Sequence, residues 1–145
     1  MGDSYNSLKK FKESNLSYEK ALQLNPNNAY VLNNYAYYLS LRNEELEKAA
    51  SMSKLSNELE ANNASFQDTY AWVLFKQKNY KEARTWIEKA IKLNKESATQ
   101  LEHYGDILYH LGEQDGAVEQ WKLAQSKGEK SEILKKKIYE KKYIE

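Results

Sequence analysis

Three side chains that could ligate a metal ion lie on one short segment: His103, Asp106 and His110. Spacings of three and four residues place them on one face of a helix, and imidazole and carboxylate groups both bind zinc. The chain has no other histidine and no cysteine, so a site here would have at most three protein ligands, all from one helix. We therefore expect no functional metal site and no bound cofactor.

Serine hydroxyls are the other candidate reactive groups. None of them stands in the strained turn between a strand and a helix that exposes a catalytic serine, and no strand pattern occurs over a useful length. The five glycines do not form a loop that could cradle a phosphate. We expect no enzymatic activity from this chain.

The elements that carry these side chains repeat along the sequence. Four small residues, Ser14, Ala49, Ala83 and Ala117, are separated by 35, 34 and 34 positions. Sets of similar residues that share one step indicate a repeated unit of two helices and a turn. Three further sets follow nearly the same steps: Tyr18, Ser53, Ile87 and Trp121; Ala21, Ser56, Ala90 and Ala124; and Gly2, Ala36, Ala71 and Gly105.

One unit carries an extra residue. The step from Ala36 to Ala71 is 35, and the step from Phe11 to Leu46 is already 35. The insertion therefore falls between Ala36 and Leu46, most simply in the polar segment Asn43-Glu44-Glu45. Insertions are tolerated best in surface turns, so we expect a turn between two helices there.

Apolar residues recur at spacings of three and four inside each unit, as in Tyr70 and Leu74, which is the pattern of amphipathic helices. Asparagines at Asn25-Pro26-Asn27-Asn28 and Asn62-Asn63 favour turns and helix caps between units. The predicted helices are 2–8, 11–24, 29–41, 45–60, 64–77, 80–93, 98–111, 114–126 and 131–143.

These units resemble the tetratricopeptide repeat family, most clearly in the fourth unit with Leu101, Tyr104-Gly105, Leu108, Ala117 and Trp121. The chain is also similar to the C-terminal repeats of bacterial proteins with many such repeats. The resemblance implies an all-α fold, a right-handed superhelical solenoid closed by a C-terminal capping helix. The expected single domain, 1–145, divides into repeats 1–28 (truncated), 29–63, 64–97 and 98–131, and a capping helix 132–145.

The resemblance also implies that the first helices of the units line a concave groove that binds a peptide or helix of a partner protein. Aromatic side chains and carboxylates in this set favour a partner with apolar and basic side chains. The groove lacks the lysines and asparagines with which some family members bind a terminal carboxylate. The expected groove residues are Asn33, Tyr37, Ser40, Asp68, Trp72, Phe75, Glu102, Asp106 and Tyr109.

A structural role is the alternative. The repeat pattern begins in the middle of a helix, so we expect the chain to be the C-terminal piece of a longer repeat protein. The units could then act as a spacer or an oligomerisation element that stacks on further units or on a second copy. Self-association would use the truncated N-terminal face, with Met1, Tyr5 and Phe11.

Charge and hydropathy limit the remaining classes. Lys135-Lys136-Lys137 and Lys141-Lys142 could contact nucleic acid, but glutamates are interleaved with these lysines and favour a solvated face of the cap. We therefore expect no nucleic-acid partner. No apolar run approaches the roughly 20 residues of a membrane span, and no signal peptide is evident. The bacterial cytoplasm and the cell envelope both remain open as compartments.

Overall fold

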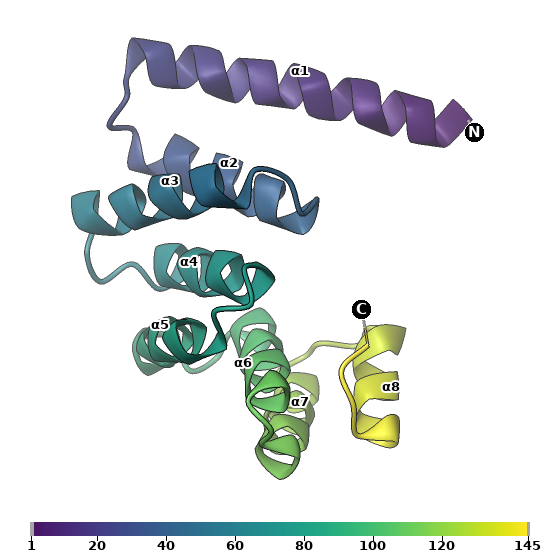
Figure 1. Ribbon diagram of the computed structural model, residues 1–145. Helices are drawn as coiled ribbons and strands as arrows, with labels where there is room; N and C mark the ends of the chain where they lie inside the picture. The colour runs from purple at the N-terminus through teal and green to yellow at the C-terminus, as the bar shows by residue number, and fades with distance from the viewer. Residues whose placement is uncertain (1, 145) are drawn as a thin grey trace.

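The computed structural model describes the backbone of residues 2–144 and the side chains of residues 12–144. This part of the chain contains helices and no strand, and successive helical hairpins stack while their axes turn (Figure 1). This is the predicted all-α repeat solenoid. The helices are α1 (Gly2–Leu24), α2 (Ala29–Leu41), α3 (Leu46–Leu59), α4 (Ala64–Lys76), α5 (Tyr80–Leu93), α6 (Ala98–His110), α7 (Gln114–Ser126) and α8 (Glu132–Glu140).

The most extensive packing joins α2 to α3, α4 to α5, and α6 to α7. We call these hairpins the second, third and fourth units. Each unit also packs its first helix against the second helix of the unit before it, α4 on α3 and α6 on α5. The stacked arrangement buries the apolar faces of the helices, which a single helical hairpin would leave exposed to water.

Helix starts and turns follow the repeat period. The N-cap side chains of Asn28, Asn63 and Ser97 each accept a hydrogen bond from the backbone N–H three residues later. The turn inside each unit contains a residue with positive φ: Asn43 at 57°, Lys78 at 65° and Gly112 at 87°. These caps and turns set where each helix begins and ends.

The extra residue of the second unit lies in the turn between its helices, as expected. Residues 42–45 connect α2 to α3, whereas three residues suffice in the other two units. Glu45 has a φ of 43°, so a second left-handed residue absorbs the insertion. The helices on either side keep their packing.

The prediction of two short helices at 2–8 and 11–24 is wrong, because α1 is one continuous helix. On the repeat register, Lys9 stands at the position of Asn43, Lys78 and Gly112. Residues 7–11 contain no glycine, proline or asparagine that would favour an end to the helix, and leucine and lysine are good helix formers. As a result α1 is much longer than the other helices and projects beyond α2 and α3 (Figure 1).

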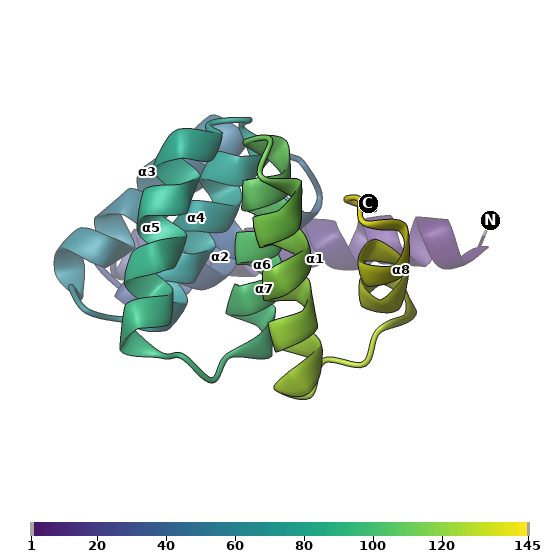
Figure 2. The same ribbon diagram turned by 90° about the horizontal axis from the view of Figure 1, so that it is seen from below.

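The C-terminal helix α8 starts where a fifth unit would start. Its N-cap Ser131 stands 34 residues after Ser97 and accepts a hydrogen bond from the N–H of Leu134. The helix lies beside α6 and α7, away from α4 and α5 (Figures 1 and 2). It ends at Lys141, which has a φ of 56°, earlier than the predicted end at 143.

Candidate functional site

The first helices of the units, α2, α4 and α6, carry all nine residues expected in the groove. Five of them, Asn33, Ser40, Trp72, Phe75 and Asp106, are buried in this structure. The other four, Tyr37, Asp68, Glu102 and Tyr109, are partly buried. Neighbouring helices cover most of the nine, so these side chains do not form one open surface in this structure, and their contact with a partner stays a prediction.

Asp68 on α4 is engaged by His103 on α6. The carboxylate oxygen Oδ1 and the ring nitrogen Nδ1 are 2.8 Å apart, and the imidazole stacks on Trp72 at 4.0 Å between centroids. Burial lowers the pKa of His103, but Asp68, with help from Asp106 and Glu102, raises it more, so that pKa lies above its ordinary value. The pair fastens the third unit to the fourth.

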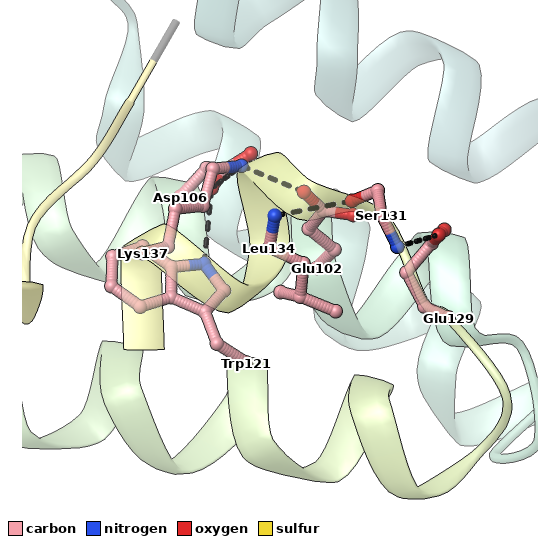
Figure 3. Close-up of polar contacts among 7 residues, drawn as sticks. All are labelled: Glu102, Asp106, Trp121, Glu129, Ser131, Leu134 and Lys137. Carbon is pink, nitrogen blue, oxygen red and sulfur yellow. Dashed lines mark hydrogen bonds and ion pairs between the residues drawn. The ribbon is translucent and has the colours of Figure 1, made fainter. Parts of the chain in front are cut away.

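Lys137 on α8 forms ion pairs with two carboxylates of α6, those of Glu102 and Asp106 (Figure 3). Its ammonium donates to Glu102 Oε2 at 2.7 Å and to Asp106 Oδ1 at 2.9 Å, and the indole Nε1 of Trp121 donates to Asp106 at 3.0 Å. Burial raises the pKa of Asp106, while Lys137 and His103 oppose that rise. Lys137 itself is 3% exposed, so its predicted place on a solvated face is wrong.

Both ion pairs use the same positions of successive repeats. Asp68 and Glu102 are 34 residues apart, and so are His103 and Lys137. A carboxylate on one first helix thus meets a cationic side chain on the next first helix at two consecutive joints. These charges bind units to each other.

The three candidate metal ligands on α6 do not come together. His103 faces Asp68, Asp106 faces Lys137, and the Nδ1 atom of His110 lies 2.8 Å from the backbone oxygen of Asp106. Within the described residues, no group of three or more metal-binding side chains converges. The three residues do share the helix α6 at the predicted spacing, but each side chain contacts a different neighbour.

An exposed apolar face remains on α2. Tyr30, Tyr37 and Leu41 follow one another at spacings of seven and four, so they form a line along the helix. Tyr30 is 60% and Leu41 48% exposed, while Tyr38 beside them is 45% exposed. We call Tyr30, Tyr37, Tyr38 and Leu41 the α2 face.

The α2 face borders α4. The Tyr30 ring meets Phe66 edge-on at 5.4 Å, and Asp68 lies close enough to Tyr37 that burial and this charge together raise the pKa of the tyrosine. Asn33 Oδ1 and Trp72 Nε1, on the same two helices, are buried without a hydrogen-bond partner among the described residues. The joint between α2 and α4 therefore combines exposed rings with unpaired polar atoms.

Phe75 lines a smaller recess. A pocket of about 180 Å³ lies between Phe75, Tyr80, His110 and Tyr143. The segment after α8 reaches this place, with the Tyr143 ring 5.7 Å from Phe75 and 4.8 Å from His110. The side-chain amide of Gln114 holds that segment by donating to the backbone oxygen of Lys141 at 2.6 Å.

The sequence analysis missed the roles of two sets of residues. His103 and Lys137 could have been found by placing each charge on the repeat register, where they align with each other. Asn57 and Gln67, which line a pocket described below, stand where the neighbouring units have aliphatic residues. In the first case the signal is agreement between two units, and in the second it is a departure from the repeat.

The comparison with protein families agrees with this architecture. The profile of the tetratricopeptide repeat family matches residues 4–128. The chain belongs to the tetratricopeptide repeat (TPR) family. Such repeats generally form protein-interaction folds without enzymatic activity. Among curated proteins, none matches the sequence significantly.

Several solved structures have a similar fold. PilF of Pseudomonas aeruginosa is 23% identical with a TM-score of 0.72, over 94% of this chain and 65% of that chain. YrrB, a TPR protein with an unusual peptide-binding site, is 27% identical with a TM-score of 0.65, over 77% and 57%. The first TPR of Spaghetti (RPAP3), bound to an HSP90 peptide, is 13% identical with a TM-score of 0.71, over 78% and 89%.

The TPR chain shows no helix among its described residues that is long and apolar enough to cross a membrane. This includes α1, whose length is sufficient but whose sequence contains many charged and polar side chains.

Proposed function

We propose that this TPR chain is a protein-interaction scaffold that binds a helix or peptide of a partner protein on the concave side of α2 and α4. The single observation that carries the proposal is the α2 face, where three large side chains remain 45–60% exposed on a helix that packs against α4. Aromatic side chains supply a large contact area at low entropic cost, which makes them effective anchors in interfaces. Peptide binding by YrrB and by the RPAP3 repeat supports this class of function.

The partner's character follows from what is left exposed. His103 and Lys137 already pair with the three carboxylates on which the expectation of a basic partner depended. We therefore propose a partner that is mainly apolar, with a cationic side chain only where it can approach Asp68 beside Tyr37. The groove residues that could contact it are Tyr37, Asp68 and, at the edge of its recess, Phe75.

The test uses exposed positions, because Trp72 is buried in the core and its replacement would perturb folding. Tyr30→Ser with Leu41→Ser removes the ends of the α2 face. The matched control, Leu123→Ser with Ile133→Ser, changes side chains of 41% and 45% exposure on α7 and α8. Each protein is used to capture partners from its native cells, with helicity checked by circular dichroism.

We expect a partner that the wild type and the control capture equally and that the α2-face variant loses. A synthetic copy of the captured segment should then bind the wild type at least tenfold more tightly than the variant. Identical capture by all three proteins would contradict binding at the α2 face.

A stacking role is the second candidate, and α1 favours it. Leu16 and Leu24 on this helix are 69% and 82% exposed, which suits contact with a further unit or a second copy. The side chains of Met1, Tyr5 and Phe11, expected to take part, lie outside the described residues. Analytical ultracentrifugation of the wild type and of Leu16→Ser with Leu24→Ser distinguishes the roles: only a stacking face predicts concentration-dependent association that the variant loses.

A further inference from the structure

A pocket of about 360 Å³ lies on the second-helix side of the third unit, away from the α2 face. The end of α3 and the turn after it supply one wall, Gln67 on α4 forms part of the base, and α5 supplies the other wall. The lining residues are Asn57, Ala61, Asn62, Gln67, Trp86, Lys89, Lys92 and Leu93.

Two buried amides face this pocket with unpaired oxygens. Asn57 and Gln67 are 8% and 7% exposed, and neither Asn57 Oδ1 nor Gln67 Oε1 has a hydrogen-bond partner among the described residues. The amide nitrogen of Asn57 donates to the backbone oxygens of Ser53 and Phe66, both at 3.0 Å, which fixes its orientation. Its oxygen can therefore only accept, and a donor group of a bound ligand would complete its hydrogen bonding.

The neighbouring units fill the same positions with aliphatic side chains. On the repeat register Asn57 and Gln67 correspond to Leu22 and Leu32 before them and to Ile91 and Leu101 after them. Leu22 with Leu32, and Ile91 with Leu101, belong to the apolar clusters of their own units. Of these three joints, only the middle one, between α3 and α4, replaces the apolar pair with two amides, at a cost in stability that a bound ligand would offset.

The walls indicate the charge of the ligand. Lys89 and Lys92 line the pocket and no carboxylate does. Trp86 is held by an edge-on contact with Tyr70 at 5.0 Å, and the Lys89 ammonium lies 4.1 Å from the centre of the indole ring. The cation covers the ring face on which a nucleobase would stack, whereas a carboxylate can approach it directly.

We propose that this pocket binds an extended acidic segment of a partner protein. Backbone N–H groups of the segment donate to Asn57 Oδ1 and Gln67 Oε1, its carboxylates pair with Lys89 and Lys92, and an apolar side chain lies against Trp86 and Leu93. A backbone supplies donors at regular intervals, and the lysines on α5 supply the counter-charges. This site uses different helices from the α2 face and does not depend on it.

The test is an NMR titration of the 145-residue chain with a blocked hexapeptide, Leu-Asp-Glu-Leu-Asp-Glu, and with its uncharged analogue, Leu-Asn-Gln-Leu-Asn-Gln. We expect the acidic peptide to shift the side-chain signals of Asn57, Gln67 and Trp86, with the analogue at least tenfold weaker. Absence of these shifts at millimolar peptide, or equal binding of the analogue, would overturn the proposal. Shifts caused by a hexathymidine oligonucleotide instead of the peptide would also overturn it.

Two variants separate recognition from folding. Asn57→Ile with Gln67→Leu copies Ile91 and Leu101 of the next joint, so it should fill the pocket, keep or raise the melting temperature, and weaken peptide binding at least tenfold. Lys89→Gln with Lys92→Gln leaves the packing intact and should weaken binding by a similar factor. Tyr30→Ser with Leu41→Ser should bind the peptide like the wild type; full binding by both pocket variants would refute the site.

Discussion

The second and fourth units have the same fold but hold it together by different chemistry. At the C-terminal joints, Asp68 meets His103 and Glu102 meets Lys137. At the corresponding positions of the joint between α2 and α4 stand the uncharged residues Asn33 and Thr69, and the Tyr30–Phe66 contact joins these helices instead. The repeat geometry therefore leaves the chemistry of each joint free to vary, and the N-terminal joint keeps its rings exposed.

The same contrast appears where the helices of one unit cross. Gly105 faces Trp121 in the fourth unit, whereas the corresponding residues are Ala36 and Ser53 in the second unit. A Cβ atom at Gly105 would lie 2.4 Å from the indole ring. A large side chain on one helix thus requires the smallest residue on the other.

Loss of the charge at the last joint should have the largest effect. Lys137→Met keeps the aliphatic stem but leaves the buried Asp106 without its cation, so we expect a loss of about 3–5 kcal/mol in the free energy of unfolding. Urea denaturation measures this loss. Lys135→Met, on the exposed face of α8, is the control and should change stability by less than about 0.5 kcal/mol; equal effects of the two changes would contradict a buried ion pair.

The crossing in the fourth unit should be the next most sensitive place. Gly105→Ala forces Trp121 to move, and overpacking of this kind costs about 1–3 kcal/mol. Gly116→Ala is the matched change, because a Cβ there meets only ordinary contacts at 3.5 Å, and alanine favours the helix by about 1 kcal/mol. Thermal denaturation should therefore shift in opposite directions for the two variants, and a shift in the same direction would argue against the clash.

Raising the pH should weaken the joint between the third and fourth units. The pKa of His103 is higher in the folded chain than the ordinary value of about 6.5. Its contribution is therefore complete below that ordinary value and is lost as the pH rises through the folded pKa. Asp68→Asn and His103→Gln should both reduce the slope of unfolding free energy against pH in this range; an unchanged slope would remove the pair from the joint.

Building the missing pair into the N-terminal joint should have the smallest effect. Asn33→Asp with Thr69→His copies the positions of Asp68 and His103 between α2 and α4. A double-mutant cycle should give a favourable coupling of about 1 kcal/mol. Helices α2 and α4 pack against each other more extensively than α4 and α6 do. Zero coupling would show that this packing places the two side chains differently.

Much of the fold could be predicted because the repeat signal is distributed over many positions. Small residues such as Ala83 and Ala117 mark the crossings, and the register placed the insertion in the turn at Asn43. The continuous helix α1 could not be predicted from apolar spacing alone, because a break depends on the residues of the turn, and the leucine and lysines at 8–10 favour a helix.

The site was harder to predict because a helix face does not reveal its neighbours. Asp106 and Glu102 lie on the expected helix, but Lys137, thirty residues or more away, decides that they are buried and paired. Burial of Trp72 likewise depends on the His103 ring that stacks on it. Sequence spacing supplied the direction of these side chains, and tertiary packing supplied their partners.

Lys137 also sets how the molecule comes apart. In a linear array, terminal elements normally fray first and independently of the rest. Here, departure of α8 would leave the carboxylate of Asp106 inside the fourth unit without its cation. The terminal helix and the fourth unit should therefore open as one cooperative block, and amide hydrogens of α6, α7 and α8 should exchange with a common free energy, separate from that of α2 and α3.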